Sequence, residues 1–168
     1  MTTHPDMPPV APNAQPVEIL LVEDSPDDVK LAMRAFRMNN LQNSVQVVRD
    51  GAEAIEVLMG DAARPTGLLK LVLLDLKLPK VDGIEVLRRI RAHPVLHRLP
   101  VVLLTTSRES RDIQQGYELG CNSYIVKPLD FNQFMEAMRT LGLYWLVLNT
   151  PAPMNTDEAG ADAANSET

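Results

Sequence analysis

The sequence predicts an α/β fold, a doubly wound sheet of five parallel strands flanked by five helices. Five short apolar runs alternate with stretches whose apolar residues recur at helical spacing. Four of the runs are almost continuously apolar, which is typical of parallel strands covered on both faces. A chain of 168 residues is too short for the eight βα repeats of a closed barrel, so an open sheet with right-handed crossovers is expected.

Each predicted strand is an apolar run, and each predicted helix is the apolar stripe that follows it. The strands are expected at 19–22, 45–48, 71–74, 101–104 and 124–126. The second run alternates valine with a polar residue, which favours an edge strand with one face partly solvated. The helical stripes that follow the strands begin at Val29, Ile55, Ile84, Ile113 and Phe131.

Capping signals indicate where the first and last helices begin. Ser25 precedes Pro26, and Asp27 and Asp28 occupy the first turn, where negative charge favours the helix dipole. The segment 130–133 has the spacing of a capping box. The two aspartates could instead be metal ligands, but capping already explains their spacing, so we expect them to stabilise the helix.

Charge and composition divide the chain into a body and two tails. The net charge is −6, but residues 1–16 and 149–168 contain acidic residues and no lysine or arginine, so the body at 17–148 is nearly neutral. We expect one domain at 17–148, because the proline-rich first tail and the polar, acidic second tail are typical of disorder. A nearly neutral body argues against nucleic-acid binding through a basic face.

Several features argue against membrane, disulfide and zinc chemistry. The sequence has neither an apolar run of about 18 residues nor a signal-peptide pattern, so we expect a cytoplasmic protein without a membrane segment. The single cysteine, Cys121, excludes an internal disulfide and is expected to pack as a small apolar residue rather than to act in redox chemistry. His93 and His97 have the spacing of a zinc pair, but Pro94 between them disfavours the continuous helix such a pair needs.

Polar residues follow four of the predicted strands at the point where each strand ends. Glu23 and Asp24 follow the first strand, Asp75 the third, Thr105 the fourth and Lys127 the fifth. In a doubly wound sheet these ends share one edge, where ligands bind. Three neighbouring carboxylates repel one another, and Mg²⁺ relieves that repulsion with the oxygen ligands it prefers. A lysine and a threonine nearby suit a carboxylate nucleophile that accepts a phosphoryl group.

Four segments of the chain resemble the receiver domain of two-component response regulators. They are ILLVEDSPDD at 19–28, LVLLDLKLPKVDG at 71–83, VVLLTTS at 101–107 and GCNSYIVKP at 120–128. The resemblance implies a flavodoxin-like sheet with the strand order 2-1-3-4-5. It also implies that a sensor histidine kinase donates a phosphoryl group to Asp75.

The same resemblance implies roles for the other residues at the sheet edge. The Mg²⁺ ligands would be Asp24 directly, Glu23 mostly through water, Asp75, and the backbone carbonyl of Lys77. Thr105 and Lys127 would contact the phosphoryl oxygens, and Thr105 with Tyr124 would form a two-state switch. The chain departs from the family at Thr106, where alanine is common, and the larger side chain would narrow access to the phosphoryl site.

These features favour a stand-alone response regulator that is not an enzyme acting on other molecules. Residues 149–168 are too few and too acidic for a DNA-binding output domain, so output is expected through protein contacts. A phosphorelay intermediate or a phosphate sink would use the same chemistry. A phosphatase of the haloacid-dehalogenase type needs Asp-x-Asp, whereas the sequence here is Asp75-Leu76-Lys77. A receiver-like module that is never phosphorylated would not need Asp75, Asp24 and Lys127.

The C-terminal segment predicts a partner surface. Residues 141–148 are apolar on nearly every side, and one core cannot bury all of them. We expect a homodimer built on the fifth helix and this segment; the alternative is that the segment folds back over the sheet edge. The ending YWLVLN and the long 60–69 loop also resemble single-domain regulators that pair with phytochrome-type histidine kinases.

Overall fold

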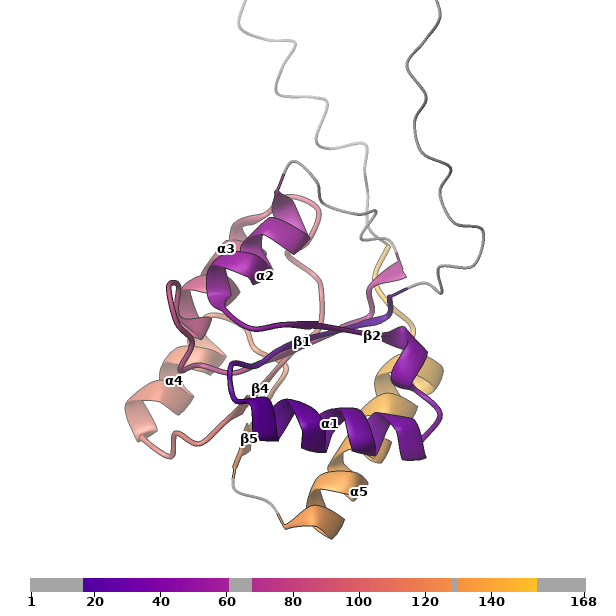
Figure 1. The fold of residues 1–168 in the computed structure, drawn as a ribbon. Helices are drawn as coiled ribbons and strands as arrows, with labels where there is room; N and C mark the ends of the chain where they lie inside the picture. Colours follow the sequence, from indigo (N-terminus) through magenta and orange to yellow (C-terminus); the bar gives the residue numbers. More distant parts are fainter. Residues whose placement is uncertain (1–16, 61–67, 128–129, 154–168) are drawn as a thin grey trace, which may run out of the picture.

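The computed structural model describes residues 17–60, 68–127 and 130–153 (Figure 1). Five parallel strands form one sheet in the order β2-β1-β3-β4-β5, as the sequence predicted. The strands are β1 (Ile19–Val22), β2 (Val45–Val48), β3 (Leu71–Leu74), β4 (Val101–Thr105) and β5 (Ser123–Val126). β4 and β5 are each one residue longer than predicted, because the parallel register continues through the pairs Val102–Ser123 and Thr105–Val126.

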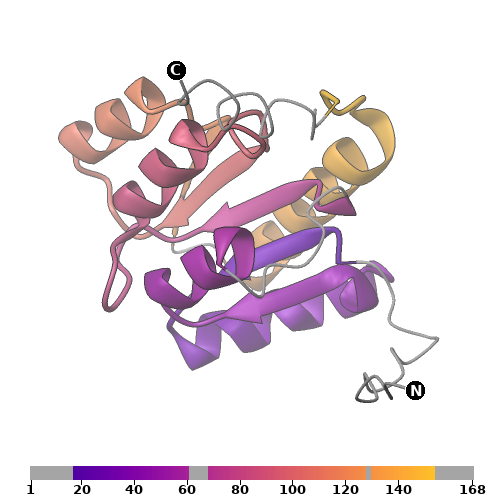
Figure 2. The same ribbon diagram turned by 90° about the horizontal axis from the view of Figure 1, so that it is seen from above.

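Helices cover both faces of the sheet (Figures 1 and 2). They are α1 (Pro26–Met38), α2 (Gly51–Met59), α3 (Gly83–Ala92), α4 (Ser110–Glu118) and α5 (Phe131–Gly142). α1 and α5 lie side by side on one face, and α2, α3 and α4 lie on the other. A short 3-10 helix, η1 (Gln42–Ser44), precedes β2, and a π-helical segment, η3 (Leu143–Leu148), extends α5.

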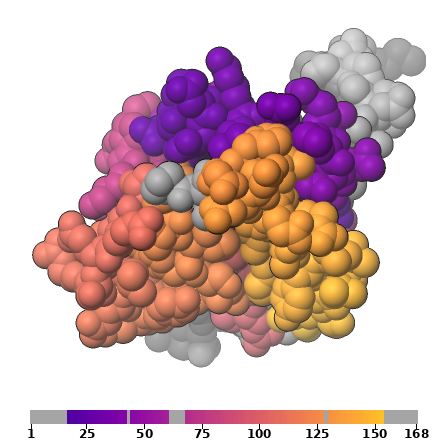
Figure 3. Space-filling model, turned by 90° about the horizontal axis from the view of Figure 1, so that it is seen from below, coloured from indigo at the N-terminus to yellow at the C-terminus, as the bar shows by residue number. Residues whose placement is uncertain are grey.

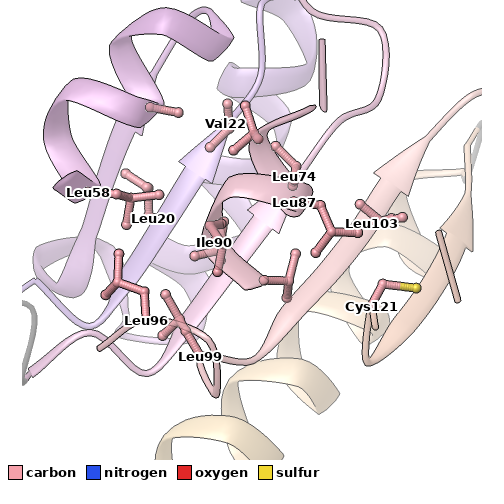
Figure 4. Close-up of a cluster of buried hydrophobic side chains, with 14 of the residues drawn as sticks. Leu20, Val22, Leu58, Leu74, Leu87, Ile90, Leu96, Leu99, Leu103 and Cys121 are labelled. Carbon is pink, nitrogen blue, oxygen red and sulfur yellow. The ribbon is translucent and has the colours of Figure 1, made fainter. Parts of the chain in front are cut away.

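Two apolar cores lie on opposite faces of the sheet because successive strand residues point to opposite sides. The core under α2 and α3 contains Leu20 and Leu74 from the strands together with Leu87 and Ile90 from α3 (Figure 4). The core under α1 and α5 contains the alternate strand residues together with Phe36, Phe134 and Met138. Central strands that bury both faces explain why their sequences are continuously apolar.

The helix starts follow the predicted capping signals. Ser25 is the N-cap of α1 and its hydroxyl accepts a hydrogen bond from the Asp28 backbone N–H at 3.3 Å, with Pro26 in the first turn. Asp130 and Gln133 form the predicted capping box of α5. The same type of cap begins α3, where the Asp82 side chain accepts a hydrogen bond from the Glu85 N–H at 2.9 Å. Local sequence therefore determines where these helices begin.

The predicted tails lie largely outside the described residues. Residues 1–16 and 154–168, and most of the 60–69 loop, are not part of the description, so the structure bears on the body alone. Within that body, every helix is too short or too polar to cross a membrane.

Candidate functional site

Three carboxylates meet at the carboxyl ends of two neighbouring strands. Glu23 and Asp24 follow β1, Asp75 follows β3, and β1 pairs directly with β3. One ligand atom from each of the three lies within 4.8 Å of the others. Glu23 and Asp75 are buried, whereas Asp24 is exposed, so the cluster opens to solvent on the Asp24 side. Among the described residues, this is the one group of three or more such side chains placed to hold a metal ion.

Glycine at the start of α3 allows the helix to approach Asp75 closely. A Cβ atom added to Gly83 would lie 2.0 Å from the backbone carbonyl oxygen of Asp75. The Gly83 N–H donates to the carbonyl of Leu76 at 2.9 Å, which ties the beginning of α3 to the end of β3. Any larger residue at Gly83 would push the helix away and disturb the backbone that carries Asp75.

Lys127 connects the carboxylates to the end of β5. Its ammonium group is buried and donates to Glu23 Oε2 at 2.8 Å and to Asp75 Oδ2 at 3.3 Å. It also donates to Asp28 Oδ2 at 2.8 Å, across from the first turn of α1. An ammonium group has three donors, so these three carboxylates satisfy it completely.

Glu23 and Lys127 influence each other's pKa through their hydrogen bond and their charges. Burial raises the pKa of Glu23 to about 7 and the negative charge of Asp75 adds to the effect, although the hydrogen bond from Lys127 opposes it. Burial lowers the pKa of Lys127, but its hydrogen bonds to Asp28 and Glu23 and the charge of Asp75 outweigh burial and raise that pKa above its usual range. The lysine therefore stays charged, and the acidic cluster still carries surplus negative charge that a cation would offset.

Thr105 and Tyr124 lie beside this cluster but are not joined directly. Thr105 ends β4 and is fully buried, and its hydroxyl oxygen accepts from the Ser107 N–H at 3.4 Å. The Tyr124 hydroxyl donates to the backbone carbonyl of Ser107 at 2.9 Å. Ser107 therefore links the two residues of the predicted switch. Thr106 is exposed, so its side chain points away from the protein interior.

Lys77 contacts the site through its backbone as well as through its side chain. Its backbone N–H donates to Asp75 Oδ1 at 3.2 Å. Its ammonium group lies 3.8 Å from Asp112 Oδ2, in the first turn of α4. The buried Asp112 carboxylate also accepts a hydrogen bond from the Ser107 hydroxyl. The residues after β3 and β4 are thus connected through α4.

Sequence reasoning missed the roles of Asp28 and Asp112. Asp28 lies in the first turn of α1, as predicted, and it also pairs with Lys127. A signal was available, because Asp28 lies in the first helical turn directly after the strand end that carries Glu23 and Asp24. No comparable signal marks Asp112, since its contacts depend on how the β4–α4 loop folds.

Two residues considered for other chemistry have structural contacts. Cys121 is buried in the core under α3, where burial raises the pKa of its thiol, as expected for a packed cysteine. The Nδ1 atom of His93 accepts hydrogen bonds from the backbone N–H groups of Val95 and Leu96, at 3.1 and 3.2 Å. The His93 Nδ1 atom therefore accepts hydrogen bonds within the turn that follows α3.

Comparison with known proteins identifies the family. The family model of the response regulator receiver domain matches residues 19–139, which include all four strand ends of the site. The chain belongs to the response regulator receiver domain family. The match lies within the domain predicted at 17–148. Proteins of this family are signalling regulators, most of which are not enzymes.

Two similar response regulators, Rcp1 and RcpA, align with this receiver domain over nearly their whole lengths. It is 37% identical over 136 residues to the response regulator Rcp1 of Synechocystis, covering 78% of this chain and 90% of Rcp1. The structure of the phosphorylated cyanobacterial phytochrome response regulator RcpA has a TM-score of 0.72 and 38% identity, covering 83% of this chain and 100% of RcpA. The structure of a Mn²⁺-bound form of Rcp1 also has a TM-score of 0.72, at 34% identity, covering 82% and 100% of the two chains.

Proposed function

We propose that this receiver domain is a stand-alone response regulator that accepts a phosphoryl group from a histidine kinase on Asp75. The reaction would be Mg²⁺-dependent, and the phosphorylated domain would signal through protein–protein contacts. The observation that carries the proposal is the position of Asp75, which accepts a hydrogen bond from the Lys127 ammonium and lies in one cluster with the carboxylates of Glu23 and Asp24. The match to RcpA, which was solved in phosphorylated form, supports it.

The chain's own residues explain how Asp75 would act. Its carboxylate is the nucleophile, and the Lys77 N–H orients one of its oxygens. Lys127 would neutralise charge on the incoming phosphoryl oxygens, and the Thr105 hydroxyl would donate a hydrogen bond to one of them. The chemistry is mainly positioning and charge stabilisation, so rigid strand ends suit it.

The donor set fits a hard divalent cation. We propose that Mg²⁺ binds to Asp24, Glu23, Asp75 and the backbone carbonyl of Lys77. Bound there, it would supply positive charge against the carboxylates and the phosphoryl group. Oxygen ligands and the absence of histidine or cysteine from the cluster suit Mg²⁺ or Mn²⁺ rather than zinc.

Intact-mass measurement tests the phosphoacceptor. With Mg²⁺ and acetyl phosphate, the full chain should gain the mass of one phosphoryl group, and Asp75→Asn should gain none. Asp27→Asn is the matched control, because it removes an exposed carboxylate that lies outside the cluster. Chelation of the metal should prevent labelling of the unmodified protein. Equal labelling of the unmodified chain and Asp75→Asn would refute the assignment.

The partner kinase is proposed to be of the phytochrome type. RcpA is a cyanobacterial phytochrome response regulator, and the whole length of RcpA aligns with 83% of this chain. Phosphotransfer from such a kinase should be much faster than from an unrelated histidine kinase. Subsequent transfer from Asp75 to a histidine-containing protein would instead indicate a phosphorelay intermediate.

We propose a switch that connects this site to the protein surface. Phosphorylation would draw the Thr105 hydroxyl toward the phosphoryl group, and the ring of Tyr124 would follow. The hydrogen bonds that both residues make with Ser107 support the coupling. The surface that would change is formed by α4, β5 and α5.

A homodimer through α5 and residues 141–148 is proposed from the apolar surface there. Trp145 and Leu146 pack against the core, so part of the segment does fold back over the sheet. Val147 and Leu148 remain 70% and 64% exposed. In the space-filling view this segment forms a continuous surface with α5 (Figure 3). Such an exposed apolar surface favours a protein partner.

Light scattering tests the dimer without disturbing the core. The full chain should be dimeric, and the double substitution Val147→Lys with Leu148→Lys should make it monomeric, because burying two ammonium groups is unfavourable. Tyr117→Lys on α4 is the control, since Tyr117 is also exposed but lies outside the proposed surface. A full chain that is monomeric at high concentration would contradict the proposal.

A further inference from the structure

A groove of about 590 Å³ opens beside the acidic cluster. Asp24 and Lys77 line it at the strand ends, and Arg111 and Asp112 line it from the first turn of α4. Asp24 belongs to the same carboxylate cluster as Asp75, so the groove lies next to the proposed phosphoacceptor. A small molecule in the groove would therefore be close to the reacting carboxylate.

Most carboxylates of the groove already have partners within the protein. Asp82 accepts a hydrogen bond from the Glu85 N–H as the cap of α3. Glu85 forms an ion pair with Arg88. Asp112 accepts the hydrogen bond of the buried Ser107 hydroxyl. The remaining carboxylate, Asp24, belongs to the proposed metal cluster.

Of the three cationic side chains that line the groove, Arg88 is paired with Glu85, whereas Lys77 and Arg111 are less fully engaged. Arg111 is exposed, and the ion pairs found in the described part of the chain do not include it. The Lys77 ammonium is 3.8 Å from Asp112, and its side chain is 68% exposed, so their attraction is weak. An anion in the groove would thus have two available positive charges beside the carboxylate cluster.

We propose that this groove binds the leaving part of small anionic phosphoryl donors of the acyl phosphate class. Arg111 and Lys77 are its available cationic groups, since Arg88, which also lines the groove, is paired with Glu85. The inference rests on the proposed function, because it requires Asp75 to be the acceptor. It adds a binding site on α4 to the residues at the strand ends.

The transfer step explains why positive charge is needed there. A carboxylate oxygen of Asp75 forms a bond to phosphorus, while the bond from phosphorus to the donor's carboxyl oxygen breaks. The electron pair of the broken bond stays on the departing carboxylate, and no proton moves. Negative charge therefore grows on the leaving group in the groove lined by Arg111 and Lys77, where positive charge lowers the barrier.

Labelling kinetics with acetyl phosphate provide the first test. The rate of mass gain at Asp75 is measured in Mg²⁺ over a series of donor concentrations for the full chain. Arg111→Ala should lower the second-order rate constant about three- to fivefold, the size expected for one exposed charge contact, and Arg111→Glu should lower it further. Arg108→Ala is the matched control, an exposed arginine that does not line the groove, and should leave the rate unchanged.

Phosphoramidate separates a leaving-group site from a general effect on the domain. Its leaving group is neutral ammonia, so Arg111→Ala should leave its labelling rate unchanged while the rate with acetyl phosphate falls. An equal loss with both donors, or no loss with acetyl phosphate, would overturn the inference while the phosphoacceptor assignment stands. If neither donor labels Asp75 in the unmodified chain, the proposed function and the inference both fail.

Discussion

Lys127 is the residue on which the charge balance of the site depends. Burying an ammonium group is costly unless hydrogen-bonded carboxylates surround it, and Glu23, Asp28 and Asp75 all do so here. Asp28 is the most exposed of the three partners, at 38% of its side chain. It combines two roles, because it also carries negative charge in the first turn of α1.

Substituting Asp28 should measure how much its contact with Lys127 contributes to stability. Asp28→Asn should lower the free energy of unfolding by about 1 kcal/mol more than Asp27→Asn, measured by urea unfolding at neutral pH. Both substitutions remove one negative charge from the same helix turn, but only Asp28 contacts Lys127. We expect a difference in the free energy of unfolding close to that of exposed ion pairs, because water screens the partly exposed Asp28 carboxylate. Equal losses in the two variants would show that the contact contributes nothing to stability.

At the scale of elements, Arg91 joins α3 to two loops at the opposite end of the sheet from the acidic cluster. Its guanidinium donates to the backbone carbonyls of Gly120, at 2.7 and 3.0 Å, and of Leu99, at 2.7 Å. It also donates to the Asn122 side chain, which in turn accepts from the Val101 N–H where β4 begins. One side chain thus connects the end of α3 with the segments before β4 and β5.

Removing this connection should destabilise the domain. Arg91→Ala should lower the free energy of unfolding by about 2–3 kcal/mol, because several backbone carbonyls lose a charged donor. Arg91→Lys should recover little of the lost free energy of unfolding, since an ammonium group cannot reproduce the planar set of donors of the guanidinium group. Arg89→Ala on the same helix should cost less than about 0.5 kcal/mol, as its pair with Glu85 is exposed. Chemical denaturation of the three variants decides the point, and similar losses at Arg91 and Arg89 would contradict it.

The elements themselves were largely predictable from sequence. Strands and capped helices were located correctly because apolar spacing and caps act over a few neighbouring residues. The arginines of α3 could not be told apart in this way, because Arg88 and Arg89 form exposed pairs with Glu85 whereas Arg91 binds a distant loop. The partner of Arg91 at Gly120 is 29 residues away, and no local pattern specifies such a contact.

At the scale of the whole molecule, the sheet assembles three acidic side chains whose mutual repulsion a bound cation should relieve. Glu23, Asp24 and Asp75 have ligand atoms within 4.8 Å of one another, and Lys127 offsets only part of their charge. A ligand that binds only the folded state stabilises it by mass action, by about 2.7 kcal/mol at a hundred times the dissociation constant. Cation binding should therefore raise the free energy of unfolding of the whole domain.

Thermal unfolding with and without Mg²⁺ checks this expectation. Saturating Mg²⁺ should raise the Tm of the full chain by about 5 °C or more. Asp24→Asn should unfold at a higher temperature than the unmodified protein without metal, because repulsion is relieved, and it should lose most of the Mg²⁺ effect. Asp27→Asn should keep the full effect. An unchanged Mg²⁺ shift in Asp24→Asn would exclude the proposed metal site.

By itself, the sequence determined the five-stranded α/β fold and the polar residues at the carboxyl ends of four strands. These residues are Glu23, Asp24, Asp75, Thr105 and Lys127. The fold and these residues both follow from patterns local in the chain, and the rule that parallel strands end at one edge brings the residues together. Only the tertiary structure decided their contacts. Lys127 and Asp28 are 99 residues apart, so their pairing depends on where the fold places the first turn of α1 relative to the end of β5. The contact of Asp112 with Lys77 depends in the same way on the position of α4. Such contacts arise from packing, and for that reason no short stretch of sequence contains them.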